Sequence, residues 1–529
     1  HSFPTRRSSD LYETRLDQIS WMMDRDEVVL TQQKPLPGNM VDIGIDSLRT
    51  SGPTYLSVHP GQDELQFVAP EAVYNYRTRN LYASRVPFIE VADAYVFPYQ
   101  GDVEVGYQAS MKLLENAKLL ASRLNRRHLI YNASIAVNGA NDYQGSGYYD
   151  YKDAFGNAYA IHFDRIYVDT TIQSRSTGQI AEDDRFMLSP YFDFQGQVLL
   201  AASEPFLTFD GGVQVVHDCN ISRDWLRFTS PVDPREIRIP VPEQMQNVAL
   251  NKIFAATMIT RDSAHIYSAF LSGRKDYFDA PISSAYGSLT YQPDQERYVI
   301  TIAEKEADPT YPGQYLELNT ATCEVYGEGP LDLTVDYGQV LTTAAGNTLH
   351  RLSEDEFTSR MVLGLDFHFS PDALRVMGSE IDSLPDLEPV DLTSAHYRLA
   401  MKDLLGSELA QKLERQLGLT GAYEEIPPEW SHTIFFNDLS LRWNQETKSF
   451  RYNGKVGIGN IGDIQVNKKV DAYIEFVERG SGDIFDIYLE VDERTWYYFA
   501  YSPGGLQALS SNRTFNQIIM DLRASDRRV

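Results

Sequence analysis

From Val41 onward, apolar and polar side chains alternate along the chain, and clusters of Gly, Pro, Asn and Asp interrupt the alternation at short intervals. Successive side chains of a strand point to opposite faces of a sheet, so this alternation is typical of half-buried strands joined by turns. A clear example runs through Phe192, Phe194 and Val198. The pattern continues to about residue 345 and predicts a long series of antiparallel strands.

The composition supports a mainly β fold. The chain has 529 residues, enough for about three to four domains, and its 33 Tyr and 25 Phe favour pleated, half-buried surfaces. The excess of 74 acidic over 47 basic residues gives a formal net charge of -27, which repels phosphate backbones, so we expect no nucleic-acid partner. No apolar run reaches about 18 residues, so we expect no transmembrane helix in this fragment.

The beginning of the chain differs in kind from the rest. His1–Leu11 read as the in-frame translation of a sequencing-library adapter, and artefacts of this kind are excluded from fold reasoning. We therefore expect the natural sequence to begin near Tyr12 and the chain to be the C-terminal fragment of a longer protein. A signal peptide, lipid-attachment cysteine or membrane anchor would lie in the missing part.

The two cysteines, Cys219 and Cys323, are too few for a disulfide scaffold. Free cysteine is among the most buried residue types, so we expect two buried thiols. The alternative is that the two residues pair in an oxidising compartment.

Two tyrosine-rich segments that lie far apart in the chain share one pattern. In each, a run that begins with Gly (147–151 and 287–291) precedes a turn and a second run of alternating residues (159–161 and 298–300). Both segments are predicted to be β-hairpins, and their similarity suggests a duplicated β unit whose copies bury their faces by stacking. Chance similarity between two tyrosine-rich hairpins is the alternative.

Helical signals are fewer. Ser370 followed by Pro371 is typical of a helix start, because serine caps the first turn and proline fits its first position. A second helix is predicted from about Ser394 to Gly418, where leucines recur every four residues. Apolar spacing also predicts a helix at Ser110 to Leu124, and an amphipathic helix is expected from about Gln507 to Arg523.

These patterns predict a mainly β chain: an elongated antiparallel β-repeat region of jellyroll or solenoid type, a helical middle segment, and a small barrel-like C-terminal β domain with a closing helix. The short strands of that last domain fit a pleckstrin-homology-like layout, with orthogonal sheets of another topology as the alternative. The expected segments are the adapter-derived 1–11, a linker or remnant of a truncated upstream domain at 12–40, β-repeat regions at 41–245 and 246–365, a helical segment at 366–425, and the C-terminal domain at 426–529.

Two short segments resemble the sequence motifs of ligand-binding sites. Gly457–Gly462 matches the dinucleotide fingerprint, but that fingerprint must open a helix whose N-terminus receives the pyrophosphate. Here Asp463–Val466 has the pattern of a strand, so we interpret the glycines as a turn and bulge.

His217–Cys219, with Asp224 nearby, combines metal-ligand residue types. Neighbouring strand residues point to opposite faces, so we expect no metal there.

Other polar and aromatic residues have structural interpretations. Asp366 and His368 share one face of a predicted strand, and we interpret them as a hydrogen-bonded pair at a sheet edge, with an acid–base pair as the alternative. The tyrosines between 143 and 159 could stack sugars, but cross-strand aromatic pairs stabilise sheets without a ligand.

No nucleophile elbow, P-loop, zinc-protease or calcium-loop motif is present. We therefore assign no catalytic, cofactor-binding or metal-binding residue.

The segments Leu81–Ala83, Val86–Ala94 and Val96–Pro98, followed by turn-separated strands, resemble the repeating units of OstA-like proteins, the β-jellyroll components of lipopolysaccharide transport. The chain is also similar to long uncharacterised exported proteins of Gram-negative bacteria. The resemblance covers about 41–345. It implies stacked hairpins that form an open trough whose apolar interior shields acyl chains, and it transfers no catalytic residue. The helical segment and the C-terminal domain depart from the short transport proteins.

We therefore expect a non-enzymatic protein of the Gram-negative cell envelope, periplasmic or outer-membrane-associated, that acts as a scaffold or handles lipid. Its expected partners are lipid or other envelope proteins, and no cofactor is expected. The alternative is a secreted glycan-binding or glycan-cleaving protein, which would hold two acids roughly 5–10 Å apart beside exposed aromatic rings in an open cleft. A peptide-binding adaptor that uses an exposed strand edge is a third class.

Overall fold

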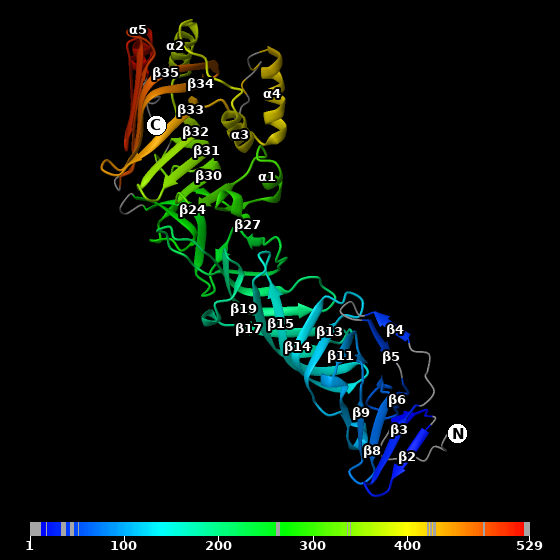
Figure 1. Cartoon of the computed structure of the whole chain (residues 1–529). Helices are drawn as coiled ribbons and strands as arrows, with labels where there is room; N and C mark the ends of the chain where they lie inside the picture. Colours follow the sequence, from blue (N-terminus) through cyan, green and yellow to red (C-terminus); the bar gives the residue numbers. More distant parts are fainter. Residues whose placement is uncertain are drawn as a thin grey trace. The chain divides into compact units, whose positions relative to one another are not determined.

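The chain is mainly β, with large antiparallel sheets and few helices, as the alternation predicts (Figure 1). The structure is a computed structural model that describes residues 12–16, 18–32, 39–42, 47–50, 52–260, 265–335, 337–338, 340–420, 423, 426, 430–479 and 482–522. The chain divides into two compact units: unit 1 comprises His1–Val213 and Arg227–Ile237, and unit 2 comprises Gln214–Leu226 and Arg238–Val529.

Unit 1 is built from β-sheets. Its strands are β1 (Tyr12–Thr14), β2 (Gln18–Met22), β3 (Glu27–Thr31), β4 (Asn39–Asp42), β5 (Ser47–Thr50), β6 (Thr54–Ser57), β7 (Gln66–Val68), β8 (Glu71–Asn75), β9 (Asn80–Ser84), β10 (Ile89–Val91), β11 (Ala94–Phe97), β12 (Val103–Val105), β13 (Leu114–Ala121), β14 (His128–Gly139), β15 (Asp142–Lys152), β16 (Ala158–Val168), β17 (Ser174–Ile180), β18 (Met187–Ser189), β19 (Phe192–Ala201), β20 (Thr208–Val215) and β21 (Leu226–Pro231). A 14-stranded sheet has the order β1-β6-β7-β10-β11-β13-β14-β15-β16-β17-β19-β20-β21, with β18 beside β19. A 5-stranded sheet has the order β12-β9-β8-β3-β2, and β4 pairs with β5.

The large sheet of unit 1 curls, because strands far apart in its order touch at their ends. In the β10–β11 turn, Ala92 N donates to Ala140 O of the β14–β15 turn at 2.7 Å, and Ala140 N donates to Gln62 O at 2.9 Å. The β10–β11 turn also reaches β17, where Ser174 N donates to Asp93 Oδ1 at 3.0 Å. The inward face buries large side chains, among them Tyr55, Phe67, Ile130, Tyr143, Phe163, Phe192, Phe194 and Phe209.

Two segments of unit 1 differ from the sequence-based expectation. The helix predicted at 110–124 is wrong, because the centre of this segment is strand β13. The register of β13 against β14 shifts twice and Asn116 has a φ of 54°, so the buried side chains of Leu114 and Ala117 are three residues apart and imitate a helical period. The range 12–40 is expected to be a linker or remnant, but it contains β1, β2 and β3, which pair within the sheets of unit 1.

Unit 2 contains the helices and a second large sheet. Its strands are β22 (Ile239–Val241), β23 (Met245–Gln246), β24 (Lys252–Thr260), β25 (His265–Ser272), β26 (Ala280–Ser284), β27 (Gly287–Gln292), β28 (Arg297–Thr301), β29 (Tyr315–Asn319), β30 (Glu324–Leu331), β31 (Leu341–Arg351), β32 (Glu356–Asp366), β33 (Ile434–Asn444), β34 (Ser449–Ile461), β35 (Ile464–Val477), β36 (Ile484–Glu490), β37 (Trp496–Ser502) and β38 (Gly505–Ser510). Its helices are α1 (Ala303–Ala307), α2 (Pro371–Ser383), α3 (Ala395–Leu405), α4 (Ser407–Thr420) and α5 (Arg513–Asp521). The 13-stranded sheet has the order β22-β27-β28-β29-β30-β31-β32-β33-β34-β35-β36-β37-β38, and β23, β24, β25 and β26 form a 4-stranded sheet.

Helices cover both faces of the large sheet in unit 2 (Figure 1). On one face, Met377 of α2 and Phe515 of α5 share a hydrophobic core with Met361 of β32. On the opposite face, Tyr397 of α3 packs in a core with Val362 of the same strand. Because consecutive strand residues point to opposite sides, one strand contributes to both cores.

The helix starts follow local signals, but tertiary contacts change two helices. The Ser370 side chain caps α2 as predicted. The single helix predicted at 394–418 is wrong, because Gly406, with a φ of 77°, separates α3 from α4. The C-terminal helix does not start at Gln507, which lies in β38 and pairs with β37. Helix α5 starts only after Asn512, whose side chain caps it.

The strands expected to make a small C-terminal domain continue the large sheet. β33 pairs with β32, with Leu439 opposite Met361, and β34 to β38 follow in sequence order. Among the described strands, no pairing closes this sheet. Several of the short strands expected here are joined into longer ones, in which the register shifts near Asp438 of β33 and Asn460 of β34.

The two tyrosine-rich hairpins form as predicted. In unit 1, β15 pairs with β16, and Tyr151 lies opposite Tyr159. In unit 2, β27 pairs with β28, and Tyr291 lies opposite Tyr298.

Candidate ligand-binding cleft

A cleft in unit 1 is lined by side chains from the edge of the large sheet and from the five-stranded sheet. On the large-sheet side, Tyr12 and Thr14 share one face of β1, and Thr14 lies opposite Tyr55 of β6. The Tyr55 ring stacks on Phe67 with centroids 5.4 Å apart, and the Tyr12 ring lies 5.8 Å from the same Phe67 ring. Phe67 is buried and is the cross-strand partner of Tyr55, so its ring is a fixed contact for both tyrosine rings.

The second wall comes from the five-stranded sheet. Tyr74 lies opposite Leu81, and Leu81 lies opposite Val105, so these residues form one row across β8, β9 and β12. Leu30 of β3 adds a further apolar side chain. Cross-strand neighbours on one face touch, so the row gives a continuous apolar surface.

The volume of the cleft suits a small apolar group. It measures about 190 Å³ and is lined by Tyr12, Thr14, Leu30, Tyr55, Tyr74, Arg79, Leu81, Val105 and Gly106. An apolar cavity of about 150 Å³ is large enough for benzene, and drug-sized ligands need about 300 Å³ or more. The cleft therefore fits one end of a hydrocarbon chain. No carboxylate belongs to this lining, so the two-acid arrangement of a glycosidase does not occur in this cleft.

Hydroxyl groups of tyrosine and threonine side chains interrupt the apolar lining. Two of them, Thr14 Oγ1 and Tyr55 Oη, are buried and have no hydrogen-bond partner among the described residues. Burial raises the pKa of Tyr55, and it also raises the pKa of Tyr12, where the Ser57 hydroxyl partly opposes the rise. An unpaired buried polar group costs about 1–3 kcal/mol, so a ligand oxygen that pairs with one of these hydroxyls is stabilised.

Arg79 contributes the one cationic side chain of this lining. It ends the turn between β8 and β9, its side chain is exposed, and its guanidinium carbon lies 5.6 Å from the Tyr107 ring centroid. Arg77 and Arg85 each pair with a carboxylate, whereas no ion pair of Arg79 is found within the described part of the chain. Its charge is therefore available to an anionic group of a ligand.

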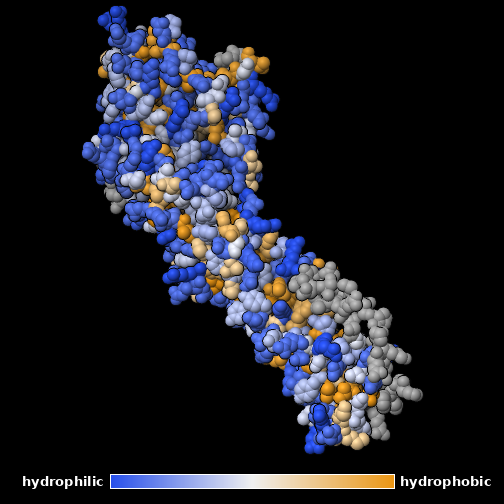
Figure 2. All heavy atoms as spheres, in the orientation of Figure 1, coloured by the Kyte–Doolittle hydropathy of each residue, from blue (hydrophilic) through white to orange (hydrophobic). Residues whose placement is uncertain are grey.

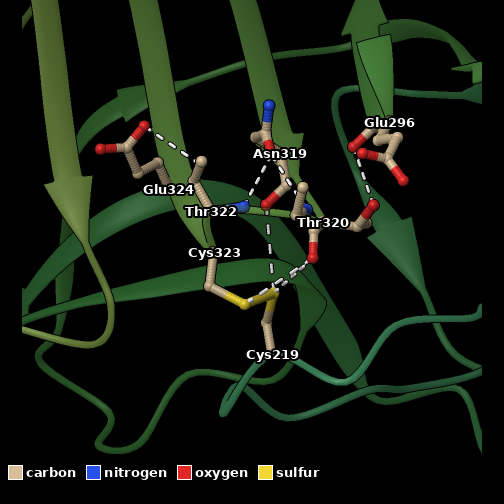
Figure 3. Close-up of a disulfide and its surroundings, with 8 residues drawn as sticks. Cys219, Glu296, Asn319, Thr320, Thr322, Cys323 and Glu324 are labelled. Atoms are coloured by element: carbon tan, nitrogen blue, oxygen red, sulfur yellow. Dashed lines mark hydrogen bonds between the residues drawn. A yellow bond between two sulfur atoms is a disulfide. The ribbon is translucent and has the colours of Figure 1, made fainter. Parts of the chain in front are cut away.

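A disulfide joins Cys219 and Cys323 in unit 2 (Figure 3), so the prediction of two buried thiols is wrong. Their Cα atoms lie 5.4 Å apart, a normal distance for a disulfide. Cys219 belongs to the segment Gln214–Leu226, and Cys323 ends the turn between β29 and β30. The two residues are 104 positions apart in sequence, and only the fold brings them together.

The turn that carries Cys323 is held by its own side chains. Asn319 Oδ1 accepts hydrogen bonds from Ala321 N at 3.0 Å and from Thr322 N at 2.9 Å. Thr320 Oγ1 donates to Glu296 O at 2.7 Å, which fastens this turn to the β27–β28 turn (Figure 3). These hydrogen bonds therefore fix the position of the turn residue Cys323.

The residues of the candidate metal cluster have separate structural roles. Cys219 is in the disulfide, and His217 is buried, which lowers the pKa of its ring. The Asp224 carboxylate accepts hydrogen bonds from Asn247 Nδ2 at 3.3 Å and from Gly273 N at 3.1 Å. Among the residues that the structure describes, no group of three or more His, Cys, Asp or Glu is placed to bind a metal ion.

Asp366 pairs with a histidine other than the predicted one. It is the last residue of β32, so the exposed His368 lies beyond the strand and the two do not share a strand face. Asp366 Oδ2 lies 2.8 Å from Nδ1 of His432 instead. The His432 ring stacks on Phe435, and Gly364 leaves room for it, because a Cβ there would come within 2.6 Å of the ring. The surroundings of His432 are those of a packed structural side chain.

The glycine motif at 457–462 lies in a strand and the turn after it. β34 ends at Ile461, and β35 begins at Ile464, so no helix follows the motif, in agreement with the turn-and-bulge interpretation. A Cβ at Gly457 would lie 2.4 Å from Asn437 Oδ1, and a Cβ at Gly459 would lie 2.5 Å from the Phe435 ring. These glycines allow close side-chain packing from β33.

The tyrosines between 143 and 159 include buried structural residues. Tyr143 is fully buried and hydrogen-bonds to Ser174, and Tyr151 Oη donates to Leu188 O at 3.0 Å. Tyr148 is partly exposed and packs against the His162 ring on the neighbouring strand. These contacts fit the structural interpretation rather than a sugar platform.

Sequence reasoning missed most of the cleft. The sequence predicts a linker or remnant at residues 12–40, yet this range supplies Tyr12, Thr14 and Leu30 to the cleft. β1 has only three residues, and all five residues of β3 are half-buried, so no alternation marks β3. Leu81 belongs to the segment that carries the family resemblance, but its position in a cleft depends on strands from elsewhere in the chain.

No protein-family model matches the chain, and no curated protein is significantly similar to it. Within the described residues, no helix combines the length and the hydropathy needed to cross a membrane. The function is therefore inferred from the geometry of the cleft and from the disulfide.

Proposed function

We propose that this chain is a non-enzymatic β protein of the cell envelope that holds the apolar chain of a lipid in the cleft of unit 1. The observation that carries the proposal is the cleft itself: an opening of about 190 Å³ between two sheets, with apolar side chains on both walls. Burying a hydrocarbon chain removes apolar surface from water at a gain of roughly 0.8 kcal/mol per methylene. The unpaired hydroxyls of Thr14 and Tyr55 favour a ligand that also carries an oxygen.

The charge at the cleft favours an anionic lipid. Arg79 is exposed and has no ion-pair partner among the described residues, so it can pair with a carboxylate or phosphate of a bound lipid. The large curled sheet supports the cleft, because its buried interior holds β6 and β7 in place.

The disulfide supports a compartment outside the cytosol. Disulfides form and persist in oxidising environments such as the bacterial periplasm, and they are rare where thioredoxin and glutathione keep thiols reduced. Cys219 and Cys323 pair within one unit. A periplasmic or outer-membrane-associated location is therefore part of the proposal.

The binding test uses a dansyl-labelled fatty acid, whose emission rises in an apolar site. The intact chain is expected to bind it, and Leu81→Phe is expected to weaken binding about fourfold, because the phenyl group is larger than the leucine side chain by about the volume of one methylene. Tyr82→Phe is the matched control: the residue is 43% exposed and adjacent to Leu81 on the opposite face of β9, so binding should not change.

The charge at the cleft is tested with Arg79→Gln. This variant should weaken binding of the fatty acid but not of the corresponding fatty alcohol, which has no carboxylate to pair with arginine. Absence of probe binding to the intact chain, or equal binding by Leu81→Phe, would show that the cleft does not hold an acyl chain.

The location is tested separately in a Gram-negative cell that expresses the full-length gene. The protein is expected in the periplasmic or outer-membrane fraction, with Cys219 and Cys323 protected from alkylation unless a reductant is added. Recovery in the cytosolic fraction with both thiols free would contradict the envelope assignment.

A further inference from the structure

The apolar face that lines the cleft continues past it to the edge strand β2. Leu30, which lines the cleft, lies directly opposite Ile19 of β2. Tyr74, which also lines it, lies opposite Val28 of β3, and Val28 lies opposite Trp21 of β2. Directly opposed residues of antiparallel strands point to the same face, so Ile19, Val28 and Trp21 lie on the cleft face of the five-stranded sheet. These three residues are named the β2 extension.

Burial decreases along the cleft face toward the sheet edge. At the cleft, Val105 and Leu81 are 2% and 8% exposed. Val28 is half-buried, and Ile19 and Trp21 at the edge are 47% and 62% exposed. Figure 2 shows apolar residues together at the end of unit 1 that carries β2 and β3. The cleft face is therefore open to water at the β2 extension.

The two faces of the five-stranded sheet differ in composition. Every strand residue on the cleft face is aliphatic or aromatic, from Val105 of β12 to Trp21 of β2. The opposite face carries polar residues in each strand, among them Ser20, Glu71 and Glu104. An antiparallel sheet normally turns its polar face to water. Exposed apolar residues that continue the lining of a cleft therefore indicate a ligand that extends beyond the cleft.

The charged groups next to Trp21 pair with one another. The Trp21 ring contacts the Tyr76 ring, with centroids 6.2 Å apart, and Tyr76 Oη donates to Asp26 at 2.6 Å. The other oxygen of Asp26 lies 2.7 Å from the Arg77 guanidinium. Asp26 is thereby neutralised, so the β2 extension suits an uncharged part of a ligand.

The one cation of the cleft lining lies at the other end of the same face. The Arg79 guanidinium lies 5.6 Å from the ring of Tyr107, which follows β12 directly after Gly106. β12 and β2 are the two edges of the five-stranded sheet. A ligand with an anionic end at Arg79 and an apolar tail toward Trp21 therefore matches the polarity of the whole face.

The dimensions of this face fit a long acyl chain. Adjacent strands lie about 4.8 Å apart, so the four steps from β12 to β2 span roughly 19 Å. The cleft alone, about 190 Å³, holds about eight carbons, since a cavity of about 150 Å³ takes benzene. One acyl chain of a bilayer occupies half of the hydrocarbon core, about 15 Å. The cleft is therefore too small for such a chain, whereas the whole face is long enough.

We propose that the ligand is a long acyl chain that lies across the whole cleft face, with its anionic end at Arg79 and its methyl end on the β2 extension. The inference rests on the proposed function, because the cleft must hold the first part of the chain. It specifies the substrate class of that site as long-chain rather than short-chain acyl groups.

The test is displacement of the dansyl-labelled fatty acid by octanoic, dodecanoic and hexadecanoic acid, each below its critical micelle concentration. A chain on an open face leaves water on about one side, so each methylene should contribute about half of its full burial, or roughly twofold in affinity. Hexadecanoic acid should therefore bind the intact chain roughly 15-fold more tightly than dodecanoic acid.

Ile19→Thr with Trp21→Thr should reduce this difference to about twofold or less and leave octanoic acid binding unchanged. Both residues are exposed, and threonine favours strands, so β2 should remain paired. The matched control is Met22→Thr with Tyr82→Thr. Both of these residues are 43% exposed on the opposite face of the sheet, so the control should retain the full difference between the acids.

The position of the methyl end is tested by quenching. Hexadecanoic acid with bromine on its last carbon should quench the emission of Trp21, the one tryptophan of unit 1. Octanoic acid brominated in the same way should not, because its chain ends within the cleft. Trp21→Phe should still bind the long acid and should lose the quenching.

Each result separates the inference from the proposed function. Equal affinity of the intact chain for dodecanoic and hexadecanoic acid, or a full difference that persists in the threonine double variant, would overturn the inference. The cleft assignment would stand in that case if octanoic acid binds and Leu81→Phe weakens it. Binding of none of the three acids would contradict the proposed function itself. Dimers that the threonine double variant abolishes, without any dependence on acid length, would assign the β2 extension to a second copy of the chain and overturn the inference.

Discussion

Removal of the disulfide is expected to be the largest single loss of stability in unit 2. The bond closes a loop of 104 residues, and chain entropy assigns about 4.7 kcal/mol to a loop of this length. A domain is stable by about 5–15 kcal/mol in total, so this bond is a substantial part of the whole. The double variant Cys219→Ala with Cys323→Ala tests the size of the effect. Cys323 has a φ of 53°, and alanine carries the same Cβ as cysteine, so the substitution adds no new backbone strain there.

Urea unfolding followed by tryptophan fluorescence measures this loss in the intact chain. Trp225, Trp430, Trp443 and Trp496 belong to unit 2, and Trp21 belongs to unit 1, so the emission reports mainly on unit 2. With a urea dependence of about 3 kcal/mol/M, the midpoint should fall by about 1.5 M. Reduction of the parent chain should produce the same shift, and reduction of the double variant should produce none.

A change of the midpoint below about 0.3 M, for both the variant and the reduced parent chain, would refute the reasoning. It would mean that the segment 214–226 is held to the β29–β30 turn mainly by other contacts. The Cys219 side chain already approaches the carbonyls of Asn319 and Thr320, so this comparison separates the covalent bond from local packing.

Three further predictions concern helices of unit 2, each measured by urea unfolding. Gly406→Ala should destabilise the chain by about 1–3 kcal/mol, because the φ of 77° and ψ of 159° at this position suit only glycine. The control is Gly418→Ala, which lies inside α4. The added Cβ has no atom within 4 Å, so this variant should be neutral or stabilising. Ser370→Ala should cost about 1 kcal/mol by removing the cap of α2, and Ser370→Asp should retain the stability; an equal loss in both would contradict the capping role. Burial raises the pKa of Asp403 to about 6, so the favourable protonated form is fully present below about pH 4 and is lost as the pH rises through 6. Asp403→Asn should therefore be more stable than the parent chain at pH 7.5, by up to about 3 kcal/mol, and the difference should vanish near pH 4.

Local signals in the sequence predicted the class of fold and several elements. Alternation predicted the strands, because a half-buried strand exposes every second residue whatever its partner. Ser370 and Pro371 predicted the start of α2, because capping involves only neighbouring residues. The turn between the tyrosine-rich strands likewise predicted both hairpins.

Local signals failed where a distant contact changed the pattern. Bulges in β13 spaced Leu114 and Ala117 like residues of a helix, and pairing with β37 drew Gln507 into a strand. The positive φ at Gly406 divided a run of leucines that reads as one helix. In each case the backbone follows a partner or a conformation that apolar spacing does not encode.

The sequence by itself determined that this chain is mainly β, is acidic and contains two cysteines. Only the tertiary structure decided that Cys219 and Cys323 pair, that residues 12–31 complete two sheets, and that Tyr12, Tyr55 and Leu81 meet in one cleft. The reason is physical: side-chain periodicity records which face of an element is buried, whereas a cleft or a disulfide depends on the distance between residues that are far apart in the chain.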